Sequence, residues 1–465
     1  MGDLSTNEKT HNMKSQLGFY GGVGSVTGAN FMLDTGGAAI LIDCGLEQGS
    51  RFASEQNTLP FVYNPSDVDV LMVTHAHADH IGRIPKLVRD GFSGVIYSTK
   101  PTKALAAIML ADALKVMEYE HERYGYEVLY EAGDIRAALA LWKTVDYNDE
   151  ITLPDNVTAF YSDAGHILGS GMVHFSRGDK TIVFTGDIGN VPQPLLNPPV
   201  IPTGYDYLVM ESVYGDRLHE EVAERTSLLK SYIEDTRAKG GTLIIPAFSL
   251  ERTQGMLLEI NNLVESGSIQ PIPVFLDSPL AISVTDEYRT FASYLKNSVQ
   301  DQIKAGDDIF DFEGLSFTQT VKESHEIDAH KGAKIIIAGS GMSHGGRIRR
   351  HEQNYLGDPK TTVLLVGYQS AGSLGRILQD GGTKVKIDGK DVRVKAKVAT
   401  IRGFSGHADR DQLLGLVAEG SGNAKAVYVV MGEERSSLFL TQRLRDYLGL
   451  NAKAPDQNEE IEIDF

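Results

Sequence analysis

Short apolar runs alternate with polar helical segments along most of the chain. Residues 17–20, 30–34 and 38–43 have the pattern of short strands, whereas the stretch 101–146 is rich in alanine, leucine and glutamate, as helices are. Strand patterns return at residues 157–161, 171–175, 181–185 and 207–211. We therefore expect the first part of the chain to combine β-sheet with helices.

The pattern changes after residue 211. A long helix is predicted over residues 218–239, and apolar strands that alternate with helices follow it, as in a parallel α/β sheet. Residues 392–398 then alternate between polar and apolar positions and indicate a strand of the first domain again. We therefore predict an α/β protein with a parallel-sheet domain inserted into a first domain. The predicted segments are a flexible leader (1–16), the first domain (17–211 and 386–465) and the inserted domain (212–385).

Length and composition narrow the class of protein. A chain of 465 residues suits two or three domains, no apolar run is long enough to span a bilayer, and the first ten residues lack the core of a signal peptide. The one cysteine, Cys44, excludes an intramolecular disulfide framework, so we expect a cytoplasmic protein without a membrane anchor. The net charge of −18 means that any binding of nucleic acid needs a local basic groove.

Metal-ligand residue types are concentrated in one loop. Thr74-His75-Ala76-His77-Ala78-Asp79-His80 follows a predicted strand and precedes a predicted helix over residues 81–88. The strand provides rigidity and the loop directs the imidazoles, so this arrangement predicts a metal site. His166 and Asp187 lie in later turns and would add ligands, because two zinc ions need more than four side chains. Asp43 ends a neighbouring strand and would orient a ligand imidazole.

Loops of the inserted domain are candidates for phosphate binding. They follow predicted parallel strands, whose ends are where such sheets bind ligands. Backbone N–H groups of glycines suit phosphate oxygens, and arginines add the positive charge that the whole chain lacks. The candidates are Ser249, Arg252, Ser340, Gly341, Gly345, Gly346, Arg347 and Arg376. A glycine turn followed by a solvated basic helix end stays open as an alternative.

These motifs resemble the β-CASP branch of the metallo-β-lactamase superfamily. The loop from His75 to His80, with Asp43, His166 and Asp187, is similar to the superfamily signature. Glu211 in Glu-Ser-Val-Tyr-Gly-Asp-Arg and His407 in Phe-Ser-Gly-His-Ala-Asp bracket the insert as in the β-CASP branch. RNA-directed members of that branch carry this histidine, and DNA-directed members usually carry valine. The resemblance therefore favours RNA, and it is strongest to prokaryotic homologues of the polyadenylation-complex endonuclease subunit.

The resemblance also implies a fold and a metal centre. The fold is an αββα sandwich that carries an inserted parallel-sheet β-CASP domain. Two Zn²⁺ ions per chain are implied, one held by His75, His77 and His166, the other by Asp79, His80 and His407, with Asp187 bridging them. Glu211 would bond to His407 or to a metal-bound water. The residues expected to act in catalysis are Asp79, Asp187, Glu211 and His407.

The implied activity is hydrolysis of phosphodiester bonds in single-stranded RNA, in RNA processing or decay, by a hydroxide that bridges two zinc ions. An endonuclease is favoured, and a 5′–3′ exonuclease stays open. Two other functions stay open as well: a di-zinc hydrolase of a small ester or thioester, and a catalytically weak RNA-binding subunit. Eukaryotic relatives have a general-acid histidine where this chain has Ile377, and Arg376, His351 or water could replace it. Homodimers are common in the family, so a homodimer is a further expectation.

Overall fold

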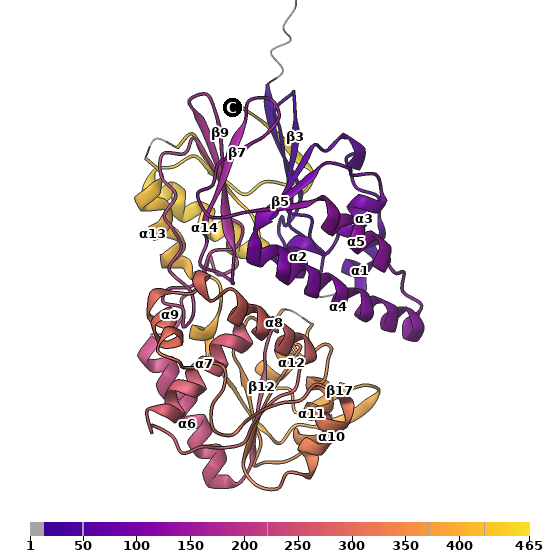
Figure 1. Ribbon diagram of the computed structural model, residues 1–465, viewed down its shortest axis with the longest axis vertical. Helices are drawn as coiled ribbons and strands as arrows, with labels where there is room; N and C mark the ends of the chain where they lie inside the picture. Colours follow the sequence, from indigo (N-terminus) through magenta and orange to yellow (C-terminus); the bar gives the residue numbers. More distant parts are fainter. Residues whose placement is uncertain (1–13, 49–50, 221, 371, 423) are drawn as a thin grey trace, which may run out of the picture.

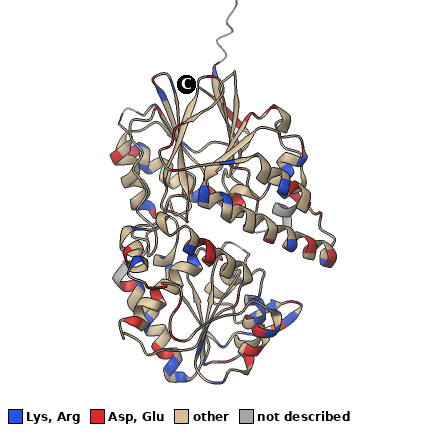
Figure 2. Cartoon of the chain, viewed as in Figure 1, with Lys and Arg blue, Asp and Glu red and all other residues tan. Residues whose placement is uncertain are grey.

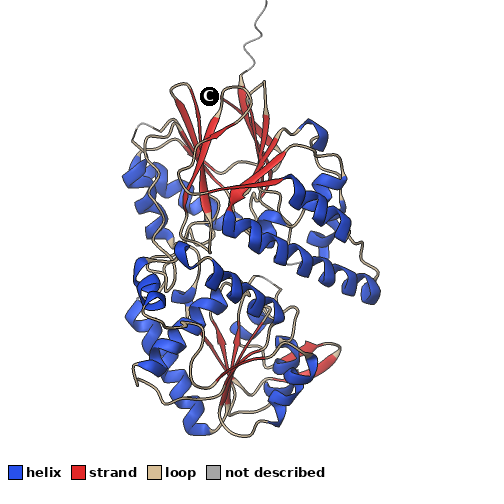
Figure 3. Ribbon diagram, in the orientation of Figure 1, coloured by secondary structure: helices blue, strands red, loops and turns tan. Residues whose placement is uncertain are grey.

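The computed structural model describes residues 14–48, 51–220, 222–370, 372–422 and 424–465, which form two parts (Figure 1). The first part contains two seven-stranded mixed sheets, and the second contains a six-stranded parallel sheet. Figure 3 shows the two sheets of the first part at its centre with helices outside them, and helices around the sheet of the second part. The predicted α/β fold, a sandwich with a parallel-sheet insert, is confirmed.

The first sheet joins the two ends of the described chain. Its strands, in spatial order, are β22 (Glu459–Ile463), β1 (Ser15–Gly21), β2 (Asn30–Asp34), β3 (Ala39–Ile42), β4 (Val70–Met72), β5 (Val95–Thr99) and β6 (Trp142–Val145). Pairing is antiparallel from β22 to β3 and parallel from β3 to β6. Ser15 and Gln16 already pair within β1, so the predicted leader of residues 1–16 is wrong at its end, and residues 1–13 lie outside the described residues.

The second sheet packs face to face on the first. Its strands, in order, are β21 (Ala452–Lys453), β20 (Ala426–Val429), β11 (Tyr207–Met210), β10 (Lys180–Phe184), β9 (Gly171–Arg177), β8 (Thr158–Asp163) and β7 (Ile151–Thr152). Phe19 and Phe31 of the first sheet lie against Tyr428 and Phe184 of the second, with ring centroids 5.5 and 6.3 Å apart. Burial of these large rings holds the two sheets together.

Helices cover the outer faces of both sheets. Beside the first sheet lie α1 (Arg51–Thr58), α2 (Ala78–Ile81), α3 (Ile84–Arg89), α4 (Lys100–Tyr124) and α5 (Ala132–Leu141), and beside the second lie α13 (Arg410–Gly420) and α14 (Glu434–Leu448) (Figure 1). The helix predicted over residues 81–88 is divided at Gly82 and Arg83. The stretch 101–146 is also divided, because α4 ends at Gly125, whose φ of +74° suits glycine, and β6 begins at Trp142.

The parallel sheet of the insert has the order β14 (Leu315–Phe317), β13 (Val274–Leu276), β15 (Lys334–Ala338), β12 (Thr242–Pro246), β16 (Thr362–Leu365) and β19 (Lys397–Thr400). Around it are α6 (Val222–Lys239), α7 (Arg252–Glu265), α8 (Pro279–Thr290), α9 (Asn297–Lys304), α10 (Val321–Ala329), α11 (Ile348–Tyr355) and α12 (Leu374–Gln379). Its strands β12, β15 and β16 are buried on both faces, as their unbroken apolar sequences predict.

The interpretation of residues 392–398 as a strand of the first domain is wrong. β18 (Lys390–Arg393) pairs with β17 (Lys384–Ile387) in a two-stranded hairpin, and β19 is the edge strand of the insert sheet, next to β16. Alternation shows that one face of a strand is buried, but it does not show which sheet buries it. The insert sheet therefore extends to Thr400, beyond residue 385.

Two further expectations concern the single cysteine and the presence of membrane-spanning helices. Cys44 is fully buried, and burial raises the pKa of its thiol to about 12, so the thiol is inert. Among the described residues, no helix combines the length and the apolar character needed to cross a bilayer.

Candidate metal centre

The donor-rich loop begins where β4 ends, and a buried carboxylate supports it from behind. Asp43 follows β3, which runs parallel to β4, so both strands end at the same edge of the sheet. Its carboxylate accepts hydrogen bonds from the Thr74 amide at 2.8 Å and the Thr74 hydroxyl at 2.7 Å. Its Oδ2 also lies 2.7 Å from Nδ1 of His80. Because Nδ1 of His80 is engaged there, Nε2 points into the loop.

Three imidazoles converge on one oxygen of Asp187. Nδ1 of His77 lies 3.0 Å from Nε2 of His75 and 3.2 Å from Nε2 of His166. Oδ2 of Asp187 is 3.4 Å from Nε2 of His75 and 3.5 Å from Nε2 of His166. Donors that share one tetrahedral zinc ion at about 2.0–2.1 Å lie roughly 3.3 Å apart, so this set has the spacing that one ion requires.

A second group of donors lies around the same carboxylate. Nδ1 of His407 is 3.2 Å from Oε1 of Glu211 and 3.8 Å from Oδ2 of Asp187. Nε2 of His80 is 3.4 Å from the other oxygen, Oδ1 of Asp187, and 4.0 Å from Oδ2 of Asp79. The structure thus brings every predicted metal-site residue to one place. Glu211 lies among the donors themselves, together with Asp187 and His407.

Two buried atoms of the centre have no hydrogen-bond partner. They are Nε2 of His80 and Oδ1 of Asp187, which face each other. Burial of a polar atom without a partner costs free energy, so unpaired atoms of this kind need an explanation. A divalent cation satisfies both at once, because imidazole nitrogen and carboxylate oxygen are ordinary zinc donors. The residues present therefore fit a divalent metal.

The charges of the centre favour neutral imidazoles on one side and a protonated one on the other. Burial lowers the pKa of His77 and of His166 well below the ordinary value, so both keep a free lone pair at neutral pH. Burial opposes the charged form of His80 as well, but Asp187 and Asp43 raise its pKa well above the ordinary value. Burial raises the pKa of Asp79 to about 6.

We expect metal binding to release protons. The metal-free centre holds a proton on His80 at neutral pH, and a cation must displace it, so zinc affinity falls as the pH is lowered. Calorimetric titration of the metal-free protein with zinc, in two buffers of different ionisation enthalpy, measures the protons released. Heats that are the same in both buffers would contradict this expectation.

We expect Asp43→Asn to weaken zinc binding about 10- to 100-fold, because the amide cannot replace the carboxylate that orients His80 and Thr74. The measurement is the zinc content per chain after dialysis against a graded series of chelator concentrations. Asp179→Asn, on an exposed carboxylate, is the matched control. Equal zinc retention by Asp43→Asn and the control would show that Asp43 does not support the centre.

Arg252 is the phosphate-binding candidate that the structure brings to the metal centre. It begins α7. A Cβ built on Gly406 would lie 3.2 Å from Nη2 of Arg252 and 3.3 Å from Cε1 of His166, so both side chains lie close to Gly406. Among the described residues its side chain forms no ion pair, and its buried Nε has no hydrogen-bond partner. A guanidinium without a partner therefore lies beside the loop of His407.

Ser340, Gly341, Gly345 and Gly346 form one compact loop after β15. Oγ of Ser340 accepts hydrogen bonds from the amides of His344 and Gly345. Gly346 has φ of +71°, and a Cβ there would lie 2.4 Å from the carbonyl oxygen of Gly339, so the turn requires glycine. Ser249 lies nearby, with its Oγ 3.5 Å from that of Ser278.

The other arginines that the sequence suggested are engaged within the protein. Nη1 of Arg347 is 2.7 Å from the buried Asp277 and also donates to the carbonyl of Thr318. Nε of Arg376 is 2.9 Å from Asp380. Arg349 and Arg350, which the sequence places beside Arg347, are paired as well, with Asp388 at 3.2 Å and Asp328 at 2.5 Å. Contact of Arg347 and Arg376 with RNA stays a prediction.

Sequence reasoning missed two side chains beside His407. The ring of Tyr214 lies 6.3 Å from the ring of His407 and 4.5 Å from that of His219, and Nε2 of His219 lies 3.0 Å from the carbonyl oxygen of His407. Tyr214 stands within the motif that begins at Glu211, whereas nothing in the sequence singles out His219. Of the general-acid candidates, His351 is fully buried against Asp277.

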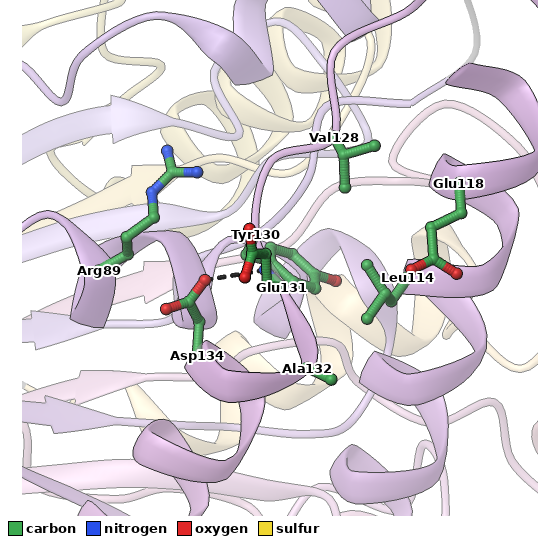
Figure 4. A pocket seen from close by; sticks show the side chains of 8 residues that line it. All are labelled: Arg89, Leu114, Glu118, Val128, Tyr130, Glu131, Ala132 and Asp134. Carbon is green, nitrogen blue, oxygen red and sulfur yellow. Dashed lines mark hydrogen bonds between the residues drawn. The ribbon is translucent and has the colours of Figure 1, made fainter. Parts of the chain in front are cut away.

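A separate pocket lies on the outer side of the first part. Arg89 of α3, Leu114 and Glu118 of α4 and the segment 128–134 line it (Figure 4). None of the predicted site residues lies in its lining. Two of its lining residues cap α5, since the amide of Glu131 donates to Asp134 at 2.8 Å. This pocket is therefore not part of the metal centre.

The sandwich fold and the histidine–aspartate centre together define a metal-dependent hydrolase of the metallo-β-lactamase type. The chain matches the model of the metallo-β-lactamase superfamily over residues 26–214, the Beta-Casp domain over residues 253–378, and the Zn-dependent metallo-hydrolase RNA specificity domain over residues 391–455. The chain belongs to the β-CASP family of the metallo-β-lactamase superfamily.

Characterised relatives cover nearly the whole chain. Ribonuclease TTHA0252 of Thermus thermophilus is 35% identical over 91% of this chain and 95% of that protein. Transcription termination factor FttA of Methanosarcina mazei is 29% identical over 95% of this chain and 71% of that protein. A crystal structure of a protein of unknown function from Enterococcus faecalis covers 97% of this chain and all of that one, with a TM-score of 0.56 and 11% identity, which shows the fold alone.

Proposed function

We propose that the protein is a zinc-dependent ribonuclease that hydrolyses phosphodiester bonds in single-stranded RNA, with endonucleolytic cleavage favoured. The observation that carries the proposal is the position of Arg252 of the insert, unpaired, against the loop of His407 at the metal centre. An anion suits this cation better than a neutral ester does. The relative named a ribonuclease, 35% identical, supports RNA as the substrate.

We propose two zinc ions per chain. His75, His77 and His166 would hold one, and Asp79, His80 and His407 the other, and Asp187 would contribute to both. When bound, the pair supplies hydroxide at neutral pH and neutralises charge on the phosphoryl oxygens. Hydrolysis of a phosphodiester needs both effects.

The chain's own residues would orient the substrate and the attacking water. Arg252 would donate to a non-bridging phosphate oxygen, because its guanidinium is unpaired beside the centre. Asp79 would orient the attacking water through its carboxylate, which lies beside His80. Glu211 would hold Nδ1 of His407, 3.2 Å away, and thereby fix the ring.

We also propose a cytoplasmic location and a homodimer, on the grounds of composition and family. A first domain of residues 17–211 and 386–465 around an insert of 212–385 remains our proposal for the domain limits. β19 lies beyond residue 385 in the sequence but pairs with β16 in the sheet of the insert.

We expect His166→Ala to abolish cleavage of single-stranded RNA and to lower the zinc content. His174→Ala is the matched control, because this histidine lies on β9, stacks on Phe160 and faces Ser162. The substrate is an RNA with a blocked 5′ end and a 3′ label, and the measurement is the length of the products. Internal products identify an endonuclease. Equal cleavage by both variants, or no cleavage by zinc-loaded wild type, would refute the proposed function.

We expect Arg252→Ala to lower kcat about 100-fold or more, as loss of a preorganised donor to a developing charge does. Zinc content should stay that of wild type, because Arg252 is outside the donor set. Arg252→Lys retains the charge but not the planar fork, so it should recover part of the rate. The matched control is Arg237→Ala on the exposed end of α6. A loss below about threefold, or a loss matched by the control, would exclude Arg252 from the reaction.

A further inference from the structure

A strip of cations follows the β17–β18 hairpin and the segment that leads to β19. Within residues 384–397 there are six basic residues and only two carboxylates, in a chain whose net charge is −18. All six basic residues are exposed. We call them the basic strip: Lys384, Lys386, Lys390, Arg393, Lys395 and Lys397. Figure 2 shows this local gathering of Lys and Arg on the lower part of the molecule.

The alternation of the strands places Lys384, Lys386 and Arg393 on one face, whereas Lys390 lies opposite Ile387 at the turn. Val385 and Ile387 are buried in the core of the insert, and Val392 and Val394 pack against that core. The residues between them must therefore face solvent. In the hairpin register Lys384 lies directly opposite Arg393, and like charges in this position destabilise a strand pair. Lys384 is paired with Asp391 at 2.8 Å, whereas Arg393 has no ion pair among the described residues, which leaves the charge of Arg393 for an anionic ligand.

Much of the strip's charge is free, unlike that of the neighbouring arginines. Arg347 and Arg349 each lie within 3.2 Å of a carboxylate. Lys386, Arg393 and Lys395, by contrast, form no ion pair with any residue that the structure describes. The positive charge available to a ligand is therefore on the hairpin and not on the glycine loop.

The strip continues the surface that begins at the metal centre. The ring of His407 lies 6.3 Å from that of Tyr214, which lies 6.1 Å from that of Tyr368. Tyr368 precedes α12 by a few residues, and α12 leads directly into β17. The polypeptide therefore links the neighbourhood of the metal centre, at Tyr368, to the hairpin through α12.

The far end of α4 lies opposite the hairpin and is acidic. In Figure 1 both project to the same side of the molecule. A hydrogen bond to Tyr119 raises the pKa of Arg123 near the end of α4, and the charge of Asp388 in the hairpin turn raises it further, so the two tips are within Coulombic range. The same end of α4 carries Glu120 and Glu122, while Glu118 lines the pocket on the outer side. These carboxylates would repel phosphates and confine them to the hairpin side.

We propose that the basic strip is a second RNA-binding site, which holds the phosphates of single-stranded RNA beyond the bond that is cleaved at the metal centre. The inference rests on the proposed ribonuclease function for its ligand. Three free cations that neutralise three phosphates contribute about 2 to the slope of log affinity against log salt, at roughly 0.7 per contact. The strip should not contribute to the affinity for an RNA that is too short to reach the hairpin.

The test compares a long and a short RNA, of about 24 and about 6 nucleotides. The variant carries Lys386→Gln, Arg393→Gln and Lys395→Gln. Binding is measured by fluorescence anisotropy on zinc-loaded protein with nuclease-resistant phosphorothioate RNAs, and cleavage is measured with the unmodified RNAs. We expect a loss of roughly 10- to 100-fold in affinity for the long RNA and a salt slope lower by about 2. Affinity for the short RNA and its cleavage should stay unchanged.

Two controls distinguish the explanations. Lys230→Gln, Arg237→Gln and Lys239→Gln remove the same charge from the exposed face of α6 and should leave binding of the long RNA unchanged. Glu120→Gln and Glu122→Gln on α4 should keep or strengthen it, because they remove repulsion. If the α4 variant weakened binding of the long RNA as much as the hairpin variant does, the proposal would be overturned. The strip would then act by contacting α4 and not by contacting RNA.

Unchanged affinity of the hairpin variant for the long RNA would also overturn it. A wild-type protein that binds the long RNA through the strip but cleaves neither RNA would refute the ribonuclease function alone.

Discussion

The buried charge of Asp187 is the constraint around which the metal centre is built. A carboxylate that is almost fully removed from water must be compensated by cations or hydrogen bonds. Histidines from separate parts of the chain, His75, His80, His166 and His407, approach its two oxygens within 3.4 to 3.8 Å. Both sheets of the sandwich must therefore end their strands at the same place, and the close pairing of the sheets fixes the distances between the donors.

The same constraint joins the sandwich to its insert. The insert begins soon after Glu211 and ends shortly before His407, and these two side chains meet at 3.2 Å. Arg252, near the start of the insert, lies against Gly406 in the same loop. Each end of the inserted domain is therefore anchored at the metal centre. A displacement of the insert would move Arg252 and the loop of His407 relative to the histidines of the sandwich.

The donors of the centre could be predicted from the sequence because their signals are local or follow strand ends. His75 to His80 form a dense motif, and Asp43 and Asp187 each follow an apolar strand. The place of Glu211 among the donors could not be predicted, because it depends on the rotation of the ring of His407. The pairing of Arg347 with Asp277 could not be predicted either, since the two stand far apart in the sequence. Arg376 and Asp380, in contrast, are one helical turn apart, a spacing at which pairing is expected.

The misplaced segment 392–398 leads to a more general conclusion about charge in this protein. Its alternation correctly indicates one buried face, and the other face is where the lysines lie. Neither the net charge of −18 nor a count of arginines near the glycine loop locates the available positive charge, because ion pairs cancel the arginines. A polyanion is attracted mainly by those cations that have no anionic partner in the folded chain. Among the described residues, cations without an ion pair include Arg252 beside the metal centre and Lys386, Arg393 and Lys395 at the hairpin.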